Sequence, residues 1–276
     1  MSKDDILTRL NHPAVNSGIF FPRQDPGHPA PPGSEDLEID VEDGAMVAAR
    51  FHPSGPTQPT VLHFHGNGEI VADYDDMAPA FHAAGASLLC ADFRGYGRST
   101  GSPSMKGLVE DAHPVLDAVL HLLAERGHAG PLVVMGRSLG SAPAIELASS
   151  RGDDVAGLVI ESGFASTLPL LDLLGINVRF LGLDHVRGDD NEDKMSRVEV
   201  PVLLLHADGD MIVPFWHAER NQERAAASDK LLVTIPDADH NTIIARGGEL
   251  YWGSIARFLS SLQVPDPGCR APQGAI

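Results

Sequence analysis

The sequence is poor in cysteine and in basic residues, and each shortage excludes a class of protein. It has two cysteines, Cys90 in an apolar segment and Cys269 in a polar tail, so we expect unpaired thiols instead of a disulfide framework. Lys and Arg total 20 against 38 Asp and Glu, which leaves a formal net charge of −18. Such a chain repels phosphate backbones and anionic lipid, so nucleic acid and membrane surfaces are not expected as partners.

Long apolar runs are also missing. No stretch approaches the roughly 18 consecutive apolar residues of a membrane span. Residues 1–5 include two aspartates, and no apolar core of a signal peptide follows them. We therefore expect a cytoplasmic protein. The 276 residues, 43% of them hydrophobic, are enough for one large core without metals or disulfides.

Proline and glycine mark the two ends of the chain. They cluster within 22–35, which we predict to be an irregular strap inside an N-terminal arm of residues 1–36. They recur in 264–276, which we predict to be a disordered tail. Residues 37–263 are then a single domain, beginning with a hairpin that turns at Asp43-Gly44.

The rest of the domain alternates between two patterns. Short runs that are apolar throughout indicate buried parallel strands at 60–64, 87–91, 132–135, 157–160, 202–205 and 231–235. Helical patterns occur at 73–84, 105–125, 139–149, 214–227 and 255–262. The alternation predicts an α/β fold, a doubly wound and mostly parallel sheet with helices on both faces and ligands at the carboxyl ends of the strands.

One motif lies in the context that a nucleophilic serine requires. The apolar run 132–135 leads into Gly-Arg-Ser-Leu-Gly at 136–140, and residues 141–147 follow a helical pattern. Strand, G-x-S-x-G and helix, in this order, are typical of a nucleophile elbow, a sharp turn that exposes the serine hydroxyl above the sheet. Glycines are expected on both sides because side chains there would clash with neighbouring strands. Ser138 is the predicted nucleophile.

A second copy of the motif, Gly-Arg-Ser-Thr-Gly at 97–101, demonstrates that the pattern alone is weak. With 28 glycines in the chain, a chance G-x-S-x-G is expected in roughly one of five such sequences. No apolar strand runs directly into this copy, and residues 102–104 read as a loop. We predict that Ser99 is not the nucleophile.

A nucleophilic serine needs a base, and the base needs an orienting carboxylate. In a fold with a nucleophile elbow, the acid and then the histidine follow the serine along the chain. Asp210 follows the run 202–205 and His240 follows the run 231–235, so both are expected on the same sheet edge as Ser138. Three other aspartates lie near these strand ends, Asp208, Asp237 and Asp239.

The glycine-rich loop after 60–64 is a candidate oxyanion hole. Its backbone N–H groups can face a substrate, and the helix that follows the elbow adds a positive dipole. We predict the backbone N–H groups of Asn67 and Leu139 as the two donors.

Two other interpretations compete with a serine hydrolase. One is a metal site, built either from His63 and His65 or from His206, Asp208, Asp210 and His240. The other is a binding protein of the same fold without catalysis. The first leaves the elbow unexplained, and the second has no need of a serine, an acid and a histidine in this order. We expect no metal and no cofactor.

Five motifs occur in a fixed order: His-Gly-Asn at 65–67, Asp-Phe-Arg-Gly-Tyr-Gly-Arg-Ser at 92–99, the elbow, Asp-Gly-Asp at 208–210 with Val-Pro at 213–214, and Asp-His at 239–240. Over residues 20–262 this set resembles the α/β-hydrolase superfamily, and within it the compact branch of serine-aminopeptidase-like hydrolases and protein depalmitoylases. The resemblance implies a structural turn at 92–99 and Asp210 as the acid.

The family inserts its cap between the strands predicted at 157–160 and 202–205, and here the insert is 164–197. Its leucines and a charged run at 187–194 suffice for one or two helices, which we expect to pack on the core and to form an apolar wall over Ser138. The predicted substrate pocket is Phe164, Leu168, Leu171, Ile212 and Phe215.

The resulting expectation is a carboxylic ester or thioester hydrolase, an esterase or thioesterase, acting on a small to medium acyl substrate as a monomer or homodimer. The alternative is an exopeptidase or amidase of the same fold. Glu69 and Glu161 are then candidates to hold a substrate ammonium group, although we expect surface or structural roles for them first.

Overall fold

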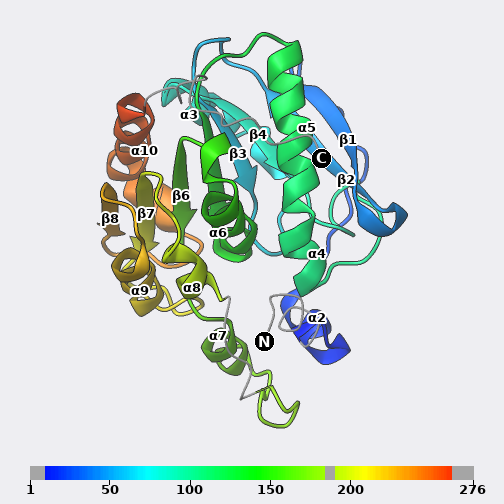
Figure 1. Ribbon diagram of the computed structural model, residues 1–276, viewed down its shortest axis with the longest axis vertical. Coiled ribbons are helices and arrows are strands. Elements are labelled where there is room, and N and C mark those ends of the chain that lie inside the picture. Colours follow the sequence, from blue (N-terminus) through cyan, green and yellow to red (C-terminus); the bar gives the residue numbers. More distant parts are fainter. Residues whose placement is uncertain (1–9, 184–189, 263–276) are drawn as a thin grey trace, which may run out of the picture.

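The computed structural model describes residues 10–183 and 190–262. An eight-stranded sheet in the order β1-β2-β4-β3-β5-β6-β7-β8 runs through it, with helices on both faces (Figure 1). The β1–β2 and β2–β4 pairs are antiparallel and all other pairs are parallel. The predicted fold class is therefore confirmed. The strands are β1 (Glu35–Asp40), β2 (Met46–His52), β3 (Thr60–Phe64), β4 (Ser87–Ala91), β5 (Leu132–Arg137), β6 (Gly157–Glu161), β7 (Val202–Ala207) and β8 (Lys230–Ile235).

The helices of the described residues follow the predicted order along the chain, but they outnumber the predicted segments and differ from them in their bounds. They are α2 (Pro13–Ile19), α3 (Ala78–Ala83), α4 (Met105–Glu110), α5 (Ala112–Glu125), α6 (Ser141–Ser150), α7 (Thr167–Leu173), α8 (Asn191–Met195), α9 (Trp216–Arg224) and α10 (Ile243–Ser261). Short 3₁₀ segments are Glu42–Gly44, Val71–Tyr74, Ser138–Gly140 and Gly152–Asp154.

Two predicted helices differ from the structure for reasons that involve proline and glycine. The segment 105–125 is two helices, because Pro114 in the first turn of α5 cannot continue the hydrogen bonds of α4. The last helix begins at Ile243, twelve positions before the predicted 255–262. It bends at Gly248, whose φ is 43°, and this interruption separates its first turn from the pattern that the sequence displays.

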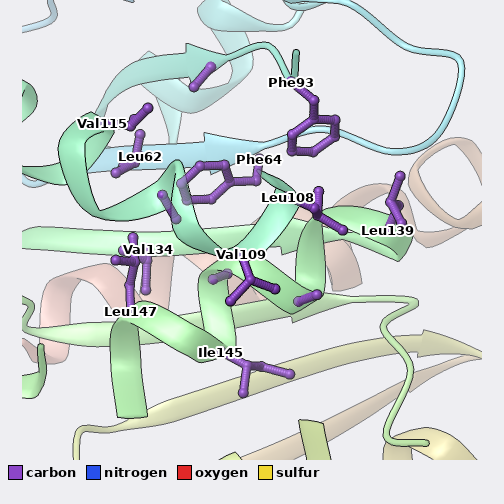
Figure 2. Close-up of a cluster of buried hydrophobic side chains, with 14 of the residues drawn as sticks. Leu62, Phe64, Phe93, Leu108, Val109, Val115, Val134, Leu139, Ile145 and Leu147 are labelled. Atoms are coloured by element: carbon purple, nitrogen blue, oxygen red, sulfur yellow. The ribbon is translucent and has the colours of Figure 1, made fainter. Parts of the chain in front are cut away.

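Side-chain alternation divides the central strands between two hydrophobic cores. In β5, Val134 packs into one core, whereas Val133 and Met135 pack into the other. Helices α4, α5 and α6 cover the first core, part of which Figure 2 shows, and α3 and α10 cover the second. The expectation of strands buried throughout is wrong for β8, where Leu231 is 53% exposed, because the edge of the sheet is covered less completely.

The N-terminal arm and the insert lie against each other at one end of the molecule (Figure 1). A Cβ atom on Gly18 in α2 would come within 2.7 Å of the Ile176 side chain, so the two segments are in close contact there. Residues 22–34 contain no helix, and α7 and α8 are the helices of the insert in its described part. The tail 264–276, Cys269 and residues 187–189 of the charged run lie outside the described residues, whereas most of the rest of that run is in α8. Cys90 is buried and unpaired.

Candidate active site

Ser138 lies on a sharp turn between β5 and α6. Its φ is +50°, a left-handed conformation that is uncommon for a residue with a side chain. A Cβ atom on Gly136 would lie 2.2 Å from the carbonyl oxygen of Gly140, and one on Gly140 would lie 2.0 Å from that of Phe64. Both flanking glycines are therefore required by close backbone approach, as predicted for an elbow.

The structure brings Ser138, His240 and Asp210 together although they lie on three different loops. Nε2 of His240 is 2.9 Å from Oγ of Ser138, and Nδ1 of His240 is 2.7 Å from Oδ2 of Asp210. The His240 ring thus spans the serine and the carboxylate. His240 and Asp210 are 5% and 4% exposed, so the contacts are largely shielded from water.

The Asp210 carboxylate is held from its other side by its own loop. Its Oδ1 accepts hydrogen bonds from the backbone N–H groups of Ile212 and Val213 at 2.9 and 2.8 Å. Burial alone raises the pKa of this carboxyl, but the hydrogen bond and charge of His240 and the Val213 N–H lower it, and the net shift is downward. Asp210 is therefore ionised at neutral pH.

The neighbouring groups separate Asp210 from the other candidate acids. Asp208 and Asp237 are exposed, and Asp239 accepts hydrogen bonds from Thr242 in its own turn. His206 donates from Nε2 to the carbonyl of Val213 at 2.8 Å, and burial lowers its pKa. A neutral His206 beside Asp210 thus stabilises the acid loop without competing for the charge of the carboxylate.

The second G-x-S-x-G forms part of a turn against β2. Ser99 is 5% exposed, and its hydroxyl accepts the backbone N–H of Ala48 at 2.9 Å. A Cβ atom on Gly97 would lie 1.9 Å from Oδ2 of Asp92, so this glycine serves close packing in the turn. These contacts support a structural role for Ser99.

The loop after β3 begins directly against the elbow, since a Cβ atom on Gly140 would lie 2.7 Å from the carbonyl oxygen of His65. Within it, the backbone N–H of Gly66 donates to Glu69 at 2.7 Å. The side chain of Asn67 is directed to the N-terminal arm and to Tyr96.

The predicted pocket residues divide into two groups. Phe164 and Leu171 are 3% and 1% exposed and belong to the first hydrophobic core. Ile212 is 41% exposed, and Phe215 and Leu168 are half-buried. The insert therefore uses its large apolar residues mainly to pack on the core, and the residues beyond the acid are the more accessible part of the predicted set.

Arg137, between Gly136 and Ser138, is a buried residue whose contacts the sequence reasoning missed. Its side chain is 11% exposed and lies 3.0 Å from Glu69 and 3.1 Å from Glu161. Glu161 is 1% exposed and also accepts a hydrogen bond from Tyr251 at 2.6 Å. The idea that Glu161 holds a substrate ammonium is therefore wrong, because this carboxylate is buried and already paired. The sequence did contain a signal for these ion pairs, namely an arginine inside the elbow and two glutamates near the ends of neighbouring strands.

The side chains of the two rival metal sets are engaged in other contacts, and in the second set these are the hydrogen bonds of His206, Asp210 and His240 described above. His63 packs against Tyr74 and Phe81, whereas His65 packs against Phe93 and Tyr96 in the other core. Across residues 10–183 and 190–262, no group of three or more His, Cys, Asp or Glu side chains is arranged to hold a metal ion. In the same part of the chain, no helix combines the length and the apolar character needed to cross a bilayer.

Comparison with known proteins agrees with this architecture. Residues 55–174 match the family described as serine aminopeptidase, S33, and residues 184–271 match the family of TAP-like proteins. An uncharacterised protein of Mycobacterium tuberculosis is 32% identical over 255 residues, which cover 89% of this chain and 87% of the relative. The uncharacterised protein YfhR of Escherichia coli is 27% identical over 257 residues, covering 90% and 88%. An esterase of Pyrococcus furiosus has a similar structure, with a TM-score of 0.71 at 19% identity over 88% of this chain and 97% of that one.

The family matches, together with the fold, place the chain in the class of hydrolases. The chain belongs to the α/β-hydrolase superfamily, over a span that includes both the nucleophile elbow and the histidine loop.

Proposed function

We propose that the protein is a serine hydrolase that cleaves a carboxylic ester or thioester of a small to medium acyl substrate through an acyl-enzyme on Ser138. The observation that carries the proposal is the continuous chain of contacts from Ser138 through His240 to Asp210. A serine hydroxyl is a weak nucleophile at its ordinary pKa, and a histidine base oriented by a carboxylate is one of the established ways to activate it.

In the acylation step, Oγ of Ser138 attacks the carbonyl carbon while its proton moves to Nε2 of His240. Asp210 accepts the N–H at Nδ1, which fixes the ring and stabilises the imidazolium. The negative oxygen of the tetrahedral intermediate accepts hydrogen bonds from the backbone N–H groups of Asn67 and Leu139. His240 then returns the proton to the departing alcohol or thiol, and the acyl group remains on Ser138.

Deacylation repeats the sequence with water as the nucleophile. His240 removes a proton from the water, the hydroxide adds to the acyl carbon, and the proton returns to Oγ of Ser138 as the carboxylic acid leaves. All the atoms required come from the substrate, from water and from these side chains, so the proposal includes no cofactor.

The family match to serine aminopeptidases supports a second candidate, an exopeptidase or amidase that uses the same three residues. An aminopeptidase needs a counter-charge for the substrate ammonium. Glu69 and Glu161, the glutamates near the strand ends, are engaged by Arg137. For this reason we place ester and thioester cleavage first.

The test is a substrate panel of p-nitrophenyl esters, acyl thioesters and aminoacyl-nitroanilides, with the Ser138→Ala variant as the blank. We expect turnover of the esters or thioesters and labelling by a fluorophosphonate probe, with or without a chelator. Preference for the nitroanilides would favour the exopeptidase. Labelling that a chelator abolishes would favour a metal-dependent site, and no labelling at all would leave a binding protein without catalysis.

A further inference from the structure

We propose that Arg137 is a positioning residue, which sets the place of the His240 imidazole relative to Ser138 by holding the loop that carries the histidine. This inference rests on the proposed function. Nη2 of Arg137 donates a hydrogen bond to the backbone carbonyl of His240 at 3.0 Å. Because Arg137 directly precedes Ser138 in the chain, this bond joins the main chain of the predicted base to the residue adjacent to the predicted nucleophile.

The guanidinium is itself fixed on the side of the glycine-rich loop. Its Nη1 is 3.0 Å from Oε1 of Glu69. The other Glu69 oxygen accepts hydrogen bonds from the backbone N–H of Gly66 and from the hydroxyl of Tyr74, both at 2.7 Å. Arg137 therefore connects the elbow to the loop that contains the predicted oxyanion donor Asn67.

On its other side the guanidinium is fixed at the end of β6. Nε of Arg137 is 3.1 Å from Oε1 of Glu161, whose second oxygen accepts the hydroxyl of Tyr251 in α10. One side chain thus contacts groups from three separate loops and strand ends. A planar guanidinium can satisfy three such directions at once, whereas a lysine ammonium on a flexible stem has no comparable fixed geometry.

The electrostatics of the cluster decide which variants are informative. Burial lowers the pKa of Arg137, but the charges of Glu161 and Glu69 raise it by more than burial lowers it. The net shift is upward, so the guanidinium stays protonated. Simple removal of Arg137 would leave two carboxylates without their cation in a buried site, which is strongly destabilising. Arg137→Lys keeps the charge. Arg137→Met combined with Glu161→Gln keeps the formal charge of the cluster at the wild-type value, since it removes one positive and one negative group.

Arg50 in β2 provides a matched control within the same chain. It is 1% exposed and, like Arg137, it contacts two carboxylates and one backbone carbonyl, those of Asp36, Asp75 and His28. β2 pairs with β1 and β4, and not with the strands that precede the predicted triad residues. Arg50→Lys therefore measures what the loss of a buried guanidinium does to stability alone.

The experiment compares melting temperature, kcat and KM for p-nitrophenyl acetate, and the rate of fluorophosphonate labelling. We expect Arg137→Lys and the double variant to lower kcat and the labelling rate about 10- to 100-fold with KM unchanged within about twofold, because a small misplacement of a catalytic group has effects of this size. Arg50→Lys should lower the melting temperature and leave kcat unchanged. If Arg137→Lys loses melting temperature as Arg50→Lys does but keeps its kcat, the inference is overturned.

A spectroscopic readout separates this inference from the proposed function. The proton shared by Nδ1 of His240 and Asp210 should give a low-field resonance in proton NMR of the wild-type protein. We expect Arg137→Lys to shift or broaden it, and Arg50→Lys to leave it in place. If the wild type labels with no probe and turns over no substrate, the proposed function fails, but a shifted resonance still supports the positioning role. An unchanged resonance in Arg137→Lys contradicts it.

Discussion

The hydroxyl of Tyr96 donates a hydrogen bond to the side-chain carbonyl of Asn67 at 2.7 Å. The same Asn67 oxygen accepts the backbone N–H of Phe21 at 3.0 Å, and the Asn67 amide nitrogen donates to the carbonyl of Ile19. The side chain therefore fastens the glycine-rich loop to the N-terminal arm. For this reason we assign the oxyanion contact to the backbone N–H of Asn67 and not to its amide group.

The first prediction follows from this arrangement. Tyr96→Phe removes the hydrogen bond to Asn67 and the one that the hydroxyl accepts from the Phe21 N–H, but this N–H keeps Asn67 as an acceptor, so the free energy of unfolding should fall by about 1 kcal/mol. Asn67→Ala removes three hydrogen bonds and should lower it more. Because alanine keeps the backbone N–H, kcat should fall less than tenfold in both variants. Denaturant unfolding and ester kinetics measure the two effects. A loss of about 10²–10³ in kcat with unchanged stability in Asn67→Ala would indicate that the side chain itself is the donor.

The second prediction concerns the two serines in G-x-S-x-G motifs. Ser138→Ala should abolish fluorophosphonate labelling and ester turnover, because the hydroxyl of Ser138 contacts His240 and that of Ser99 contacts the Ala48 N–H instead. Ser99→Ala should keep both and lose about 1 kcal/mol of stability, since the Ala48 N–H loses its buried acceptor. Peptide mapping of the labelled protein identifies the modified serine. An adduct on Ser99 would end the proposed assignment.

The third prediction separates the two aspartates of the acid loop. Asp210→Asn keeps the shape of the side chain but removes the charge that orients and stabilises the His240 ring, so kcat should fall by about four orders of magnitude. Asp208→Asn should have a mild effect, because Asp208 is exposed. Steady-state kinetics at neutral pH compare them. The opposite ranking would transfer the role of the acid to Asp208.

The fourth prediction is a loss of stability in mild acid that depends on His217. Its side chain is 1% exposed and Nδ1 accepts the backbone N–H of Ala165 at 3.1 Å, which a protonated ring cannot do. Burial and the charge of His206 outweigh Asp210 and Glu192 and lower the pKa of His217 from 6.5 to about 4.

Between pH 6.5 and pH 4 the His217 ring binds a proton in the unfolded chain but not in the folded protein. The free energy of unfolding is therefore unaffected by the titration of His217 above pH 6.5, and it falls by about 1.4 kcal/mol per pH unit from there toward pH 4. His217→Asn, which retains an acceptor, should reduce this slope in urea unfolding experiments at pH 4 to 7. His121, whose side chain is 76% exposed, is the control, and His121→Asn should leave the slope unchanged. An equal slope in wild type and His217→Asn would refute the assignment.

The fifth prediction is a preference for short acyl chains. Ile212 and Trp216, beyond the acid, are 41% and 42% exposed, so apolar contacts near the site are open to solvent. Each fully buried methylene contributes roughly 0.8 kcal/mol, but carbons beyond an open pocket stay in water. We expect kcat/KM for p-nitrophenyl esters to peak at about acetate to hexanoate, measured below micellar concentrations. A maximum at palmitate would indicate a deep acyl tunnel and favour a lipase or depalmitoylase.

The parts of the fold that depend on short-range patterns could be predicted from the sequence. The elbow is an example, because strand, glycines, serine and helix are contiguous and each has a local steric or hydrogen-bonding reason. His240 and Asp210 could be placed at one sheet edge because parallel strands bring their carboxyl ends together.

What the sequence could not give concerns long-range packing. Phe164 and Leu171 pack in the core, as expected for the insert, and their part in lining a pocket stays a prediction, because an apolar residue in an insert has the same sequence signature in both places. The partners of Arg137 come from other strands and loops, and no periodicity in the sequence indicates which charges meet. The β8 edge was misjudged because β8 is the last strand of the sheet, and α9 and α10, the helices that contact it, leave Leu231 exposed.

Under the proposed function, the left-handed backbone at Ser138 sets stability and turnover against each other. A serine in this conformation costs about 1 kcal/mol that a glycine would avoid, so Ser138→Gly is expected to raise the melting temperature slightly and to abolish turnover. A library selected for thermal tolerance alone would thus be enriched in variants with glycine at position 138. These variants would lack activity, and melting curves would not report the loss. Directed evolution of this protein needs a turnover screen at every round.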